Sequence, residues 1–517
     1  MSNEKVWHNL APFSSVSIKI QKMIRFFKCI GIIFLLFFSV VLNSCYRRPK
    51  SGEELAQTYC SGCHRFTPPN MLDKKTWKES VLLEMAFRMG LATHSPRQNS
   101  INELSNALPT VPGHALVSEK EFELITNYFI EHAPDSLPHP VKETPAALTQ
   151  FQAQEIKLSS SLPVISMLKT DSIGRVFVGG RNKQIFMLNK DLSIQEEIPV
   201  HSAPSMMALQ GKNILCLEMG IMTPNDEAIG KLVELNPRER KRKTLIDSLK
   251  RPVYFEKADF NGDDLSDFVI CEFGNNSGRL QVYQNLGNGK YRGHTVEASP
   301  GARKVELRDF NNDGKLDIVA LLAQANERIV LYTNQGNFNF SSNTLLSFPP
   351  VYGSSYFELN DFNNDGFFDI LYTNGDNGDY SDILKPYHGV RIFLNNGHQR
   401  FDESWFYPMY GASWAIARDF DADGDLDIAA ISFYPDFKKS PEQSFIYFEN
   451  QQGKFHPFTT PYSVSGRWLV MDAADYDKDG DTDVLLGALD FFSGAGNLAN
   501  QWNAKPVSLL LLKNKLH

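Results

Sequence analysis

Residues 60–64 read CSGCH, a pair of thiols two residues apart with an imidazole directly after the second. Such a pair can form a redox disulfide, half of a zinc site or the covalent anchor of a haem. No second pair follows to complete a tetrahedral zinc site, and the flanks lack the βαβ pattern of a thioredoxin-like motif. The imidazole favours haem, attached through thioethers to Cys60 and Cys63, with His64 as an axial ligand of the iron.

Two predicted helices frame these thiols. SGEELAQTYCSGCH begins with a capping box, Ser51 and Glu54, and SEKEFELITNYFIEHA begins with the same pattern at Ser118 and Glu121. A helix before the thiols and another that closes the segment resemble small c-type cytochromes. The resemblance implies an all-α, cytochrome c-like haem domain over residues 46–135 that carries single electrons.

The sixth iron ligand is expected from a third predicted helix. Residues 73–90, DKKTWKESVLLEMAFRMG, place Met85 and Met89 on one helical face. By resemblance to cytochrome domains fused to β-rich regions, we predict Met85 as the ligand and Met89 as the alternate, since a thioether raises the haem potential. Core packing of both methionines, or ligation by His94 or His114, stays open.

The N-terminal segment has the pattern of an export signal. A basic flank precedes an apolar run from Cys29 to Leu42, which is too short to span a bilayer but suits a signal-peptide core. The run ends in LNSC, which resembles a bacterial lipobox, so residues 1–44 are predicted to be a signal peptide and Cys45 the lipidated residue. A plain membrane anchor is the alternative. The Pro-rich stretch 136–150 lacks periodicity and is predicted to be a linker.

Acidic loops recur through the rest of the chain. In DFNNDGKLD, Asp309, Asn311, Asp313 and Asp317 stand at positions 1, 3, 5 and 9, and Lys315 at position 7 offers a backbone carbonyl. Alternate side chains on a tight turn converge on one point, and a hard cation such as Ca²⁺ requires six to eight oxygens. Asx turns that close hairpins without metal are the alternative.

Five such loops predict about five calcium ions. The first loop is the most doubtful, because Asp264 replaces the glycine of the other copies. The expected ligands are Asp259, Asn261, Asp263, Asp267, Asp309, Asn311, Asp313, Lys315, Asp317, Asp361, Asn363, Asp365, Phe367, Asp369, Asp419, Asp421, Asp423, Asp425, Asp427, Asp475, Asp477, Asp479, Asp481 and Asp483.

The loops mark a repeat of four strands. They begin at intervals of 50 to 58 residues, and each is followed by three apolar-alternating segments. Repeats of this length and strand content predict propeller blades. Two weaker units without carboxylates precede the five, which makes seven blades over residues 151–517. Residues 151–159 look like an orphan outer strand that completes the last blade and closes the ring.

These repeats resemble the FG-GAP/VCBS family, whose calcium-bearing propellers include the integrin α-chain head. The expected fold is therefore multi-domain, a small all-α cytochrome c-like domain followed by an all-β seven-bladed propeller. Turns between blades gather a possible partner face on the side opposite the metal loops. Packing is the alternative for its six residues, which are Tyr352, Tyr356, Tyr410, Trp414, Arg467 and Trp468.

The composition limits the function. A net charge of −8 argues against a nucleic-acid partner. Of the six cysteines, Cys216 and Cys271 lie outside the motifs, and free buried thiols are favoured over a disulfide.

Three functions fit these features. The first is an extracytoplasmic, lipid-anchored c-type cytochrome on the membrane, periplasmic or at the cell surface, that transfers electrons while its propeller docks a redox partner or a substrate. The second is a haem-linked oxidoreductase, in which a small molecule or sugar binds the propeller face. The third is a binding or adhesion module with an incidental haem. No nucleophile–base constellation assigns catalytic residues.

Overall fold

A computed structural model describes residues 50–91, 111–158, 163–378, 383–490 and 495–516. The predicted signal peptide, Cys45 and His94 lie outside these ranges. None of the helices within them is long and apolar enough to cross a membrane.

The described residues near the thiols form helices, as the periodicity predicts. They are α2 (Gly52–Cys60), the 3₁₀ turn η1 (Pro69–Met71), α3 (Lys74–Thr76), the π-helical turn η2 (Trp77–Val81), α4 (Leu82–Arg88) and α5 (Glu119–His132). Both predicted capping boxes are present. Ser51 and Glu54 exchange hydrogen bonds of 2.9 and 3.2 Å, and the Ser118 and Glu121 side chains each accept the other's backbone N–H.

An apolar core holds these helices together. Leu55 of α2, Trp77 of η2 and Phe129 of α5 are almost fully buried. The Trp77 and Phe129 rings lie 4.3 Å apart between centroids, and the Trp77 indole N–H donates to the Pro69 carbonyl at 2.8 Å. A buried indole with a satisfied N–H fixes the middle helix against the closing one.

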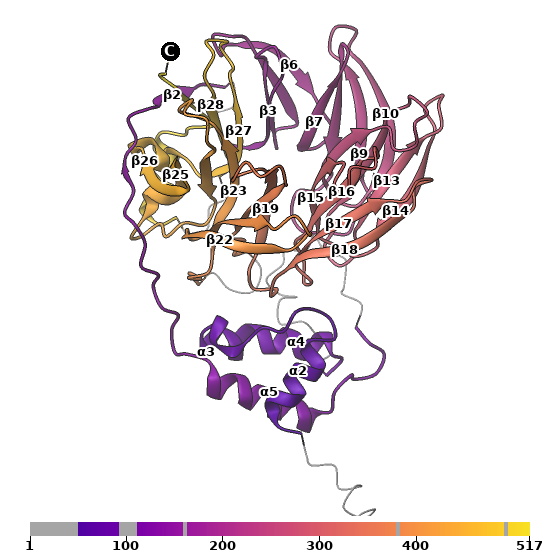
Figure 1. Ribbon diagram of the computed structural model, residues 1–517, viewed down its shortest axis with the longest axis vertical. Coiled ribbons are helices and arrows are strands. Elements are labelled where there is room, and N and C mark those ends of the chain that lie inside the picture. The colour runs from indigo at the N-terminus through magenta and orange to yellow at the C-terminus, as the bar shows by residue number, and fades with distance from the viewer. Residues whose placement is uncertain (1–49, 92–110, 159–162, 379–382, 491–494, 517) are drawn as a thin grey trace, which may run out of the picture. The chain divides into compact units, whose positions relative to one another are not determined.

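Seven sheets follow (Figure 1), which confirms the predicted all-β seven-bladed propeller. The first two blades are β3 (Ile165–Thr170), β4 (Val176–Gly180), β5 (Gln184–Leu188), β6 (Ile194–Pro199), then β7 (Pro204–Gln210), β8 (Asn213–Glu218), β9 (Gly230–Asn236), β10 (Lys241–Leu249). Blades three and four are β11 (Pro252–Ala258), β12 (Asp267–Glu272), β13 (Arg279–Asn285), β14 (Tyr291–Glu297), then β15 (Ala302–Arg308), β16 (Asp317–Leu322), β17 (Arg328–Asn334), β18 (Phe340–Ser347). Blades five and six are β19 (Ser354–Asn360), β20 (Asp369–Asn374), β21 (Gly389–Asn395), β22 (Phe401–Pro408), then β23 (Ala412–Arg418), β24 (Asp427–Ser432), β25 (Phe445–Gln451), β26 (Lys454–Thr459).

The seventh blade contains strands from both ends of the propeller sequence. Its order is β2 (Gln152–Ile156), β29 (Leu509–Lys513), β28 (Asp483–Ala488) and β27 (Trp468–Ala474). The antiparallel pairing of β2 with β29 confirms the predicted closing strand. The helix α6 (Asn497–Ala504) and the 3₁₀ turns η3 (Pro441–Ser444) and η4 (Pro461–Ser465) lie in loops of the last two blades.

Apolar clusters fill every junction between neighbouring blades, including the junction of the seventh with the first. Cys216 belongs to the cluster between blades one and two, and Cys271 to the cluster between blades three and four. Both thiols are free and fully buried. They face different junctions, so the packing alternative holds and no disulfide joins them.

The predicted linker is partly ordered against the propeller. Ala146 and Ala147 form β1, which pairs in parallel with β26, and the Leu148 N–H donates to the Thr459 carbonyl at 2.8 Å. The Tyr407 hydroxyl also donates to the Glu143 carbonyl at 2.8 Å. This segment therefore covers the outer edge of blade six, which the absence of periodicity did not indicate.

Candidate functional site

The acidic loops join the first and second strands of blades three to seven. In the second loop, Asp309 accepts backbone N–H groups from Asp313 at 3.0 Å and Gly314 at 2.8 Å. Asp313 in turn accepts the N–H of Lys315 at 2.9 Å. The carboxylates at positions 1 and 5 thus stabilise the turn through hydrogen bonds to the backbone that do not require a bound ion.

Position 6 of each loop adopts a left-handed backbone, which is why glycine is favoured there. Gly314 has a φ of 82°, and Asp264 adopts the same region with a φ of 62°. The first loop therefore keeps the conformation of its glycine-bearing relatives. Its Asp264 N–H donates to Asp259 at 2.8 Å, as the Gly314 N–H donates to Asp309.

Position 9 is buried and closes the loop onto the blade. Asp317 accepts the N–H of Phe310 at 3.1 Å through one oxygen and the N–H of Asn334 at 2.8 Å through the other. Asp267, Asp369 and Asp427 repeat this arrangement in the first, third and fourth loops. In Asp427, Oδ2 also accepts the Tyr447 hydroxyl at 2.7 Å. The other oxygens at position 9 each keep a second lone pair, so these contacts leave room for a cation.

The fifth loop differs at position 9. Asp483 accepts the N–H of Asn514 at 2.8 Å through Oδ1, but Oδ2 is buried and has no hydrogen-bond partner among the described residues. Asp475, Asp477 and Asp483 bring oxygens within 4.8 Å of one another. The Lys513 ammonium bonds to Asp477 and lies 3.2 Å from Asp479. These two carboxylates raise the pKa of Lys513.

In the fourth loop, no lysine of the described ranges forms an ion pair with the carboxylates. Asp419, Asp421 and Asp423 bring oxygens within 4.8 Å of one another, and Oδ1 of Asp425 is buried with no partner in the described part of the chain. Burial, with Asp423, Asp419 and Glu449 nearby, raises the pKa of Asp421. Burial also raises the pKa of Asp427 and of Asp483 to about 7.

The first three loops hold fewer free carboxylates. Asn261 donates to Asp263 and Asn363 to Asp365, each at 2.9 Å, while the Lys315 ammonium lies 3.1 Å from Asp313. Their ligand positions offer carboxylate and amide oxygens, whereas the fourth and fifth loops offer carboxylates alone. The unpartnered buried oxygens of the fourth and fifth loops are the observation that fits a hard divalent cation such as Ca²⁺.

The CSGCH segment lies at the C-terminal end of a helix. Cys60 is the last residue of α2, and the Cys63 N–H donates to the Cys60 carbonyl at 3.5 Å. Burial, with the Cys63 thiol beside it, raises the pKa of Cys60 to about 11. Redox-active thiols are instead stabilised as thiolates at helix N-termini, so this geometry disfavours a disulfide-exchange site.

The imidazole of His64 is oriented by the backbone. Its Nδ1 lies 2.9 Å from the Arg65 carbonyl, and because a carbonyl only accepts, Nδ1 carries the proton. Nε2 is then the nitrogen with a free lone pair, the state that metal-ligating histidines adopt. A partly buried Cys60 thiol with a raised pKa and an imidazole oriented by the backbone thus lie within five residues of each other.

The predicted sixth ligands lie on α4 and just beyond it. Met89 is 9% exposed and belongs to the helical core, whereas Met85 and Cys60 are partly buried and pack against that same core. The Met89 N–H donates to the Met85 carbonyl at 2.9 Å. His114 is exposed. Met85 is thus the more accessible of the two methionines, and its assignment as the sixth ligand stays a prediction.

The predicted partner face is largely packed. Tyr356, Tyr410, Arg467 and Trp468 are buried, and Tyr356 stacks on the half-buried Trp414 with centroids 4.4 Å apart. The packing alternative accounts for the four buried side chains.

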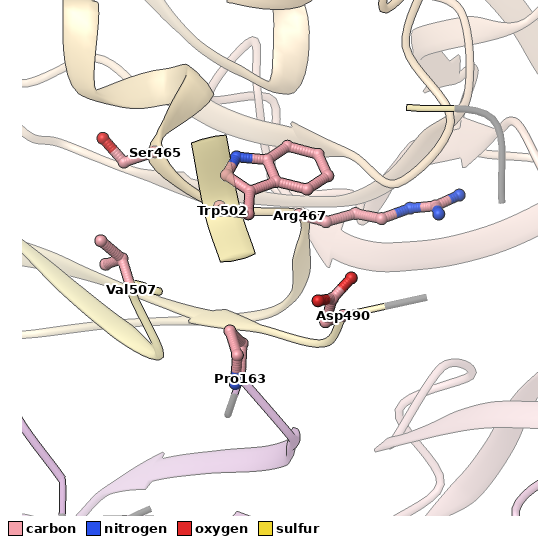
Figure 2. A pocket seen from close by; sticks show the side chains of 7 residues that line it. Pro163, Ser465, Arg467, Asp490, Trp502 and Val507 are labelled. Atoms are coloured by element: carbon pink, nitrogen blue, oxygen red, sulfur yellow. The ribbon is translucent and has the colours of Figure 1, made fainter. Parts of the chain in front are cut away.

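A small pocket remains beside Arg467 (Figure 2), with Asp490, Trp502 and Val507 among its lining residues. The Arg467 Nε donates to the Phe433 carbonyl at 2.9 Å and its guanidinium lies over the Phe433 ring. The Arg467 guanidinium is therefore held by contacts with Phe433 inside the protein.

Comparison with protein families decides the nature of the repeats. The model described as FG-GAP-like repeat matches residues 259–320, 309–372, 361–430 and 419–486. These segments are FG-GAP-like repeats. Each match begins at the first aspartate of an acidic loop, and the last one extends through the fifth loop. Comparison with curated proteins returns no match.

The chain is also similar to solved structures of low sequence identity. One is the N-terminal domain of Nup159, at 12% identity and a TM-score of 0.42, covering 72% of this chain and 99% of that one. Another is a catalytically inactive virginiamycin B lyase from Staphylococcus aureus with quinupristin, at 11% identity and a TM-score of 0.45, covering 71% and 100%. No conclusion about activity follows from these likenesses.

The FG-GAP-like repeats contain one functional element that the loop pattern alone misses. An asparagine lies within one residue of the end of the third strand in each of the five blades, and its N–H donates to position 9 of the loop. In the second repeat, Asn334 Nδ2 also donates to the Leu316 carbonyl at 3.3 Å. The recurring strand-final asparagine was the sequence signal for this clamp.

Proposed function

We propose that this protein is a lipid-anchored, extracytoplasmic c-type cytochrome that transfers single electrons. Its calcium-stabilised propeller would dock a redox partner protein or a small-molecule or sugar substrate. Cys60 and Cys63 would form the thioethers, and His64 Nε2 and Met85 would be the axial ligands. When bound, the haem supplies a one-electron redox centre.

The arrangement of CSGCH carries this proposal. The His64 Nδ1–H donates to the Arg65 carbonyl at 2.9 Å, so Nε2 is the nitrogen that carries the lone pair in the neutral ring. The Cys60 thiol stays protonated at neutral pH, because its pKa is raised to about 11. Both features disfavour thiol–disulfide chemistry and suit a covalent haem anchor.

The calcium role rests on the loops of the FG-GAP-like repeats. Within each of the five loops, the ionised carboxylates repel one another strongly. A divalent cation bound in the loop would offset that repulsion. The extracytoplasmic side is proposed because the apolar run from Cys29 to Leu42, the LNSC segment and calcium-rich surroundings suit that compartment.

Covalent haem tests the proposal directly. The chain is produced with a c-type haem maturation system, denatured and stained for haem after electrophoresis. We expect a stained band for the wild type and its loss in a Cys60→Ala, Cys63→Ala double variant. A Cys216→Ala variant is the matched control, because it removes a buried thiol outside the motif and should keep the stain.

A wild-type chain without covalent haem would end the electron-transfer proposal. If haem is present, the visible spectrum is followed while candidate small molecules or sugars are added. Reduction of the haem by a substrate would favour an oxidoreductase over an electron carrier.

A further inference from the structure

The fourth and fifth acidic loops have the same carboxylates but different neighbours. Both place aspartate at positions 1, 3, 5, 7 and 9. Asn450 and Asn514 are equivalent, because each donates its N–H to position 9 of its loop, to Asp427 and Asp483. The residue before each asparagine therefore occupies the same place in its blade.

That place holds opposite charges. It is Glu449 in the sixth blade and Lys513 in the seventh. The Lys513 ammonium bonds to Asp477, at position 3, and lies 3.2 Å from Asp479, at position 5. The first three repeats have uncharged residues at this place, Gln284, Thr333 and Leu394.

The first blade shows how a side-chain cation can serve such a turn. Asp171 follows β3 directly, as Asp475 follows β27. Asp171 accepts the Arg175 N–H at 2.8 Å and the Arg175 Nε–H at 2.7 Å. This turn is therefore closed by a guanidinium from the chain itself.

The fifth loop keeps the features of a cation site despite its lysine. Asp483 is 1% exposed, and one of its oxygens lies in the same cluster as Asp475 and Asp477. Its Oδ2 makes no hydrogen bond in the described ranges, although the Tyr476 backbone N–H is near enough to lower the pKa of this carboxyl. Oδ1 of Asp477 is also buried and unpartnered there. Among the described residues, the Lys513 ammonium contacts the carboxylates of Asp477 and Asp479 only, so the other carboxylate oxygens of the fifth loop remain available to a cation.

We propose that Lys513 is a tethered cation that competes with calcium for the fifth loop. The fifth loop then binds calcium more weakly than the fourth, although the two carry the same five carboxylates. Without calcium, Lys513 offsets the repulsion between the fifth-loop carboxylates and holds the seventh blade together. This inference rests on the calcium sites of the proposed function.

The test is calorimetric titration of the full chain with Ca²⁺, after removal of metal by a chelator. A Lys513→Gln variant should bind calcium at the fifth loop roughly three- to tenfold more tightly than the wild type. An Asp477→Asn variant assigns the fifth-loop binding event by weakening it. A Glu449→Lys variant should weaken the fourth loop by a similar factor.

Thermal unfolding separates competition from an ordinary ion pair. In chelator, Lys513→Gln should unfold at a lower temperature than the wild type, and saturating calcium should remove the difference. Lys505→Gln is the matched control, because Lys505 pairs with Glu155 of the same blade at 2.7 Å but is remote in sequence from the loop. It should leave calcium affinity unchanged.

Each contrary outcome has a distinct meaning. Equal calcium affinity in the wild type and Lys513→Gln overturns the competition while leaving the calcium sites intact. A loss of stability in Lys513→Gln that persists in saturating calcium would show that Lys513 acts only through a structural ion pair and does not compete with calcium. A wild type that binds no calcium overturns both this inference and the calcium part of the proposed function.

Discussion

Gln152 of β2 lies opposite Lys513 of β29 in the antiparallel pair that closes the propeller. The tethered cation of the fifth loop therefore extends from the strand that joins the first and last parts of the ring. The β2–β29 pairing and the fifth loop both depend on β29. Substitutions that weaken one should therefore also change the stability of the other.

Closure gives the first prediction. Ile156 of β2 is 6% exposed and packs in the cluster between blades seven and one, opposite Leu509. We expect Ile156→Ala to lower the free energy of unfolding by about 2–5 kcal/mol, because it leaves a cavity at the closing junction. Denaturant unfolding measures this. Gln152→Ala, at an exposed position of the same strand, should change it by less than about 0.5 kcal/mol. Similar losses in both would contradict the closure role.

Two glycines with the same backbone give the second prediction. Gly314 has a φ of 82° and a Cβ there would meet no atom within 4 Å, whereas Gly174 has a φ of 83° and a Cβ there would lie 2.3 Å from the Tyr476 carbonyl oxygen. In saturating calcium, Gly314→Ala should cost about 1–2 kcal/mol of stability from backbone strain alone. Gly174→Ala should cost about 1–3 kcal/mol more, because the first blade must move away from the fifth loop. Equal losses of stability in the two variants would show that the Gly174 turn is not in close contact with the Tyr476 carbonyl of the fifth loop.

The pKa values of two buried carboxyls give the third prediction. The pKa of Asp427 and of Asp483 is raised to about 7 from 3.8, chiefly by burial. A carboxyl with a raised pKa binds its proton more tightly in the folded chain, so its stabilising contribution is complete below about pH 4 and lost as the pH rises through 7. We expect the calcium-free chain to lose thermal stability between about pH 4 and 7. Calcium favours the ionised form and should remove this loss.

Scanning calorimetry in chelator and in calcium measures that dependence. An Asp427→Asn, Asp483→Asn double variant should flatten the profile in chelator, since neither side chain then titrates. A wild-type profile in chelator that parallels the double variant across this range would refute the assignment.

The two methionines give the fourth prediction, in the haem-loaded protein. Met85→Leu should lower the reduction potential and shift the visible spectrum from low to high spin, because the thioether ligand is lost. Met89→Leu should leave the spectrum unchanged and cost less than about 1.5 kcal/mol, as a volume-conserving change in the core. If only Met89→Leu altered the spectrum, Met89 would be the ligand. If neither did, both methionines would be core residues, and His94 and His114 would remain as candidate ligands.

Much of the propeller could be predicted because its signals are local. The spacing of the acidic loops and the strand pattern after each one give the blades, and the unpaired apolar segment at 151–159 gives the closing strand. The capping residues Ser51 and Ser118 mark two helices in the same way. In each case the residues that determine the element lie within a few positions of one another.

The parts that could not be predicted depend on contacts between distant segments. Lys513 and Asp477 are 36 residues apart, and no pattern along the chain joins them. Ala146 and Ala147 have no alternation that would mark a strand, because their partner strand β26 supplies the order. Trp468, which looked like a surface aromatic at a blade-to-blade turn, is fully buried in the junction between blades six and seven.

The seventh blade has a kinetic consequence. Lys505 and Glu155, which pair across it, are 350 residues apart, because β2 comes from the other end of the propeller sequence, while the four main strands of every other blade are consecutive. Contacts of such long range form late, because the entropy of closing the chain must be overcome first. The three consecutive strands of the seventh blade can therefore form before β2 pairs with β29, which leaves the outer edge of β29 uncovered. During that interval this edge is open to strand exchange between molecules, and aggregation on refolding should rise steeply with protein concentration.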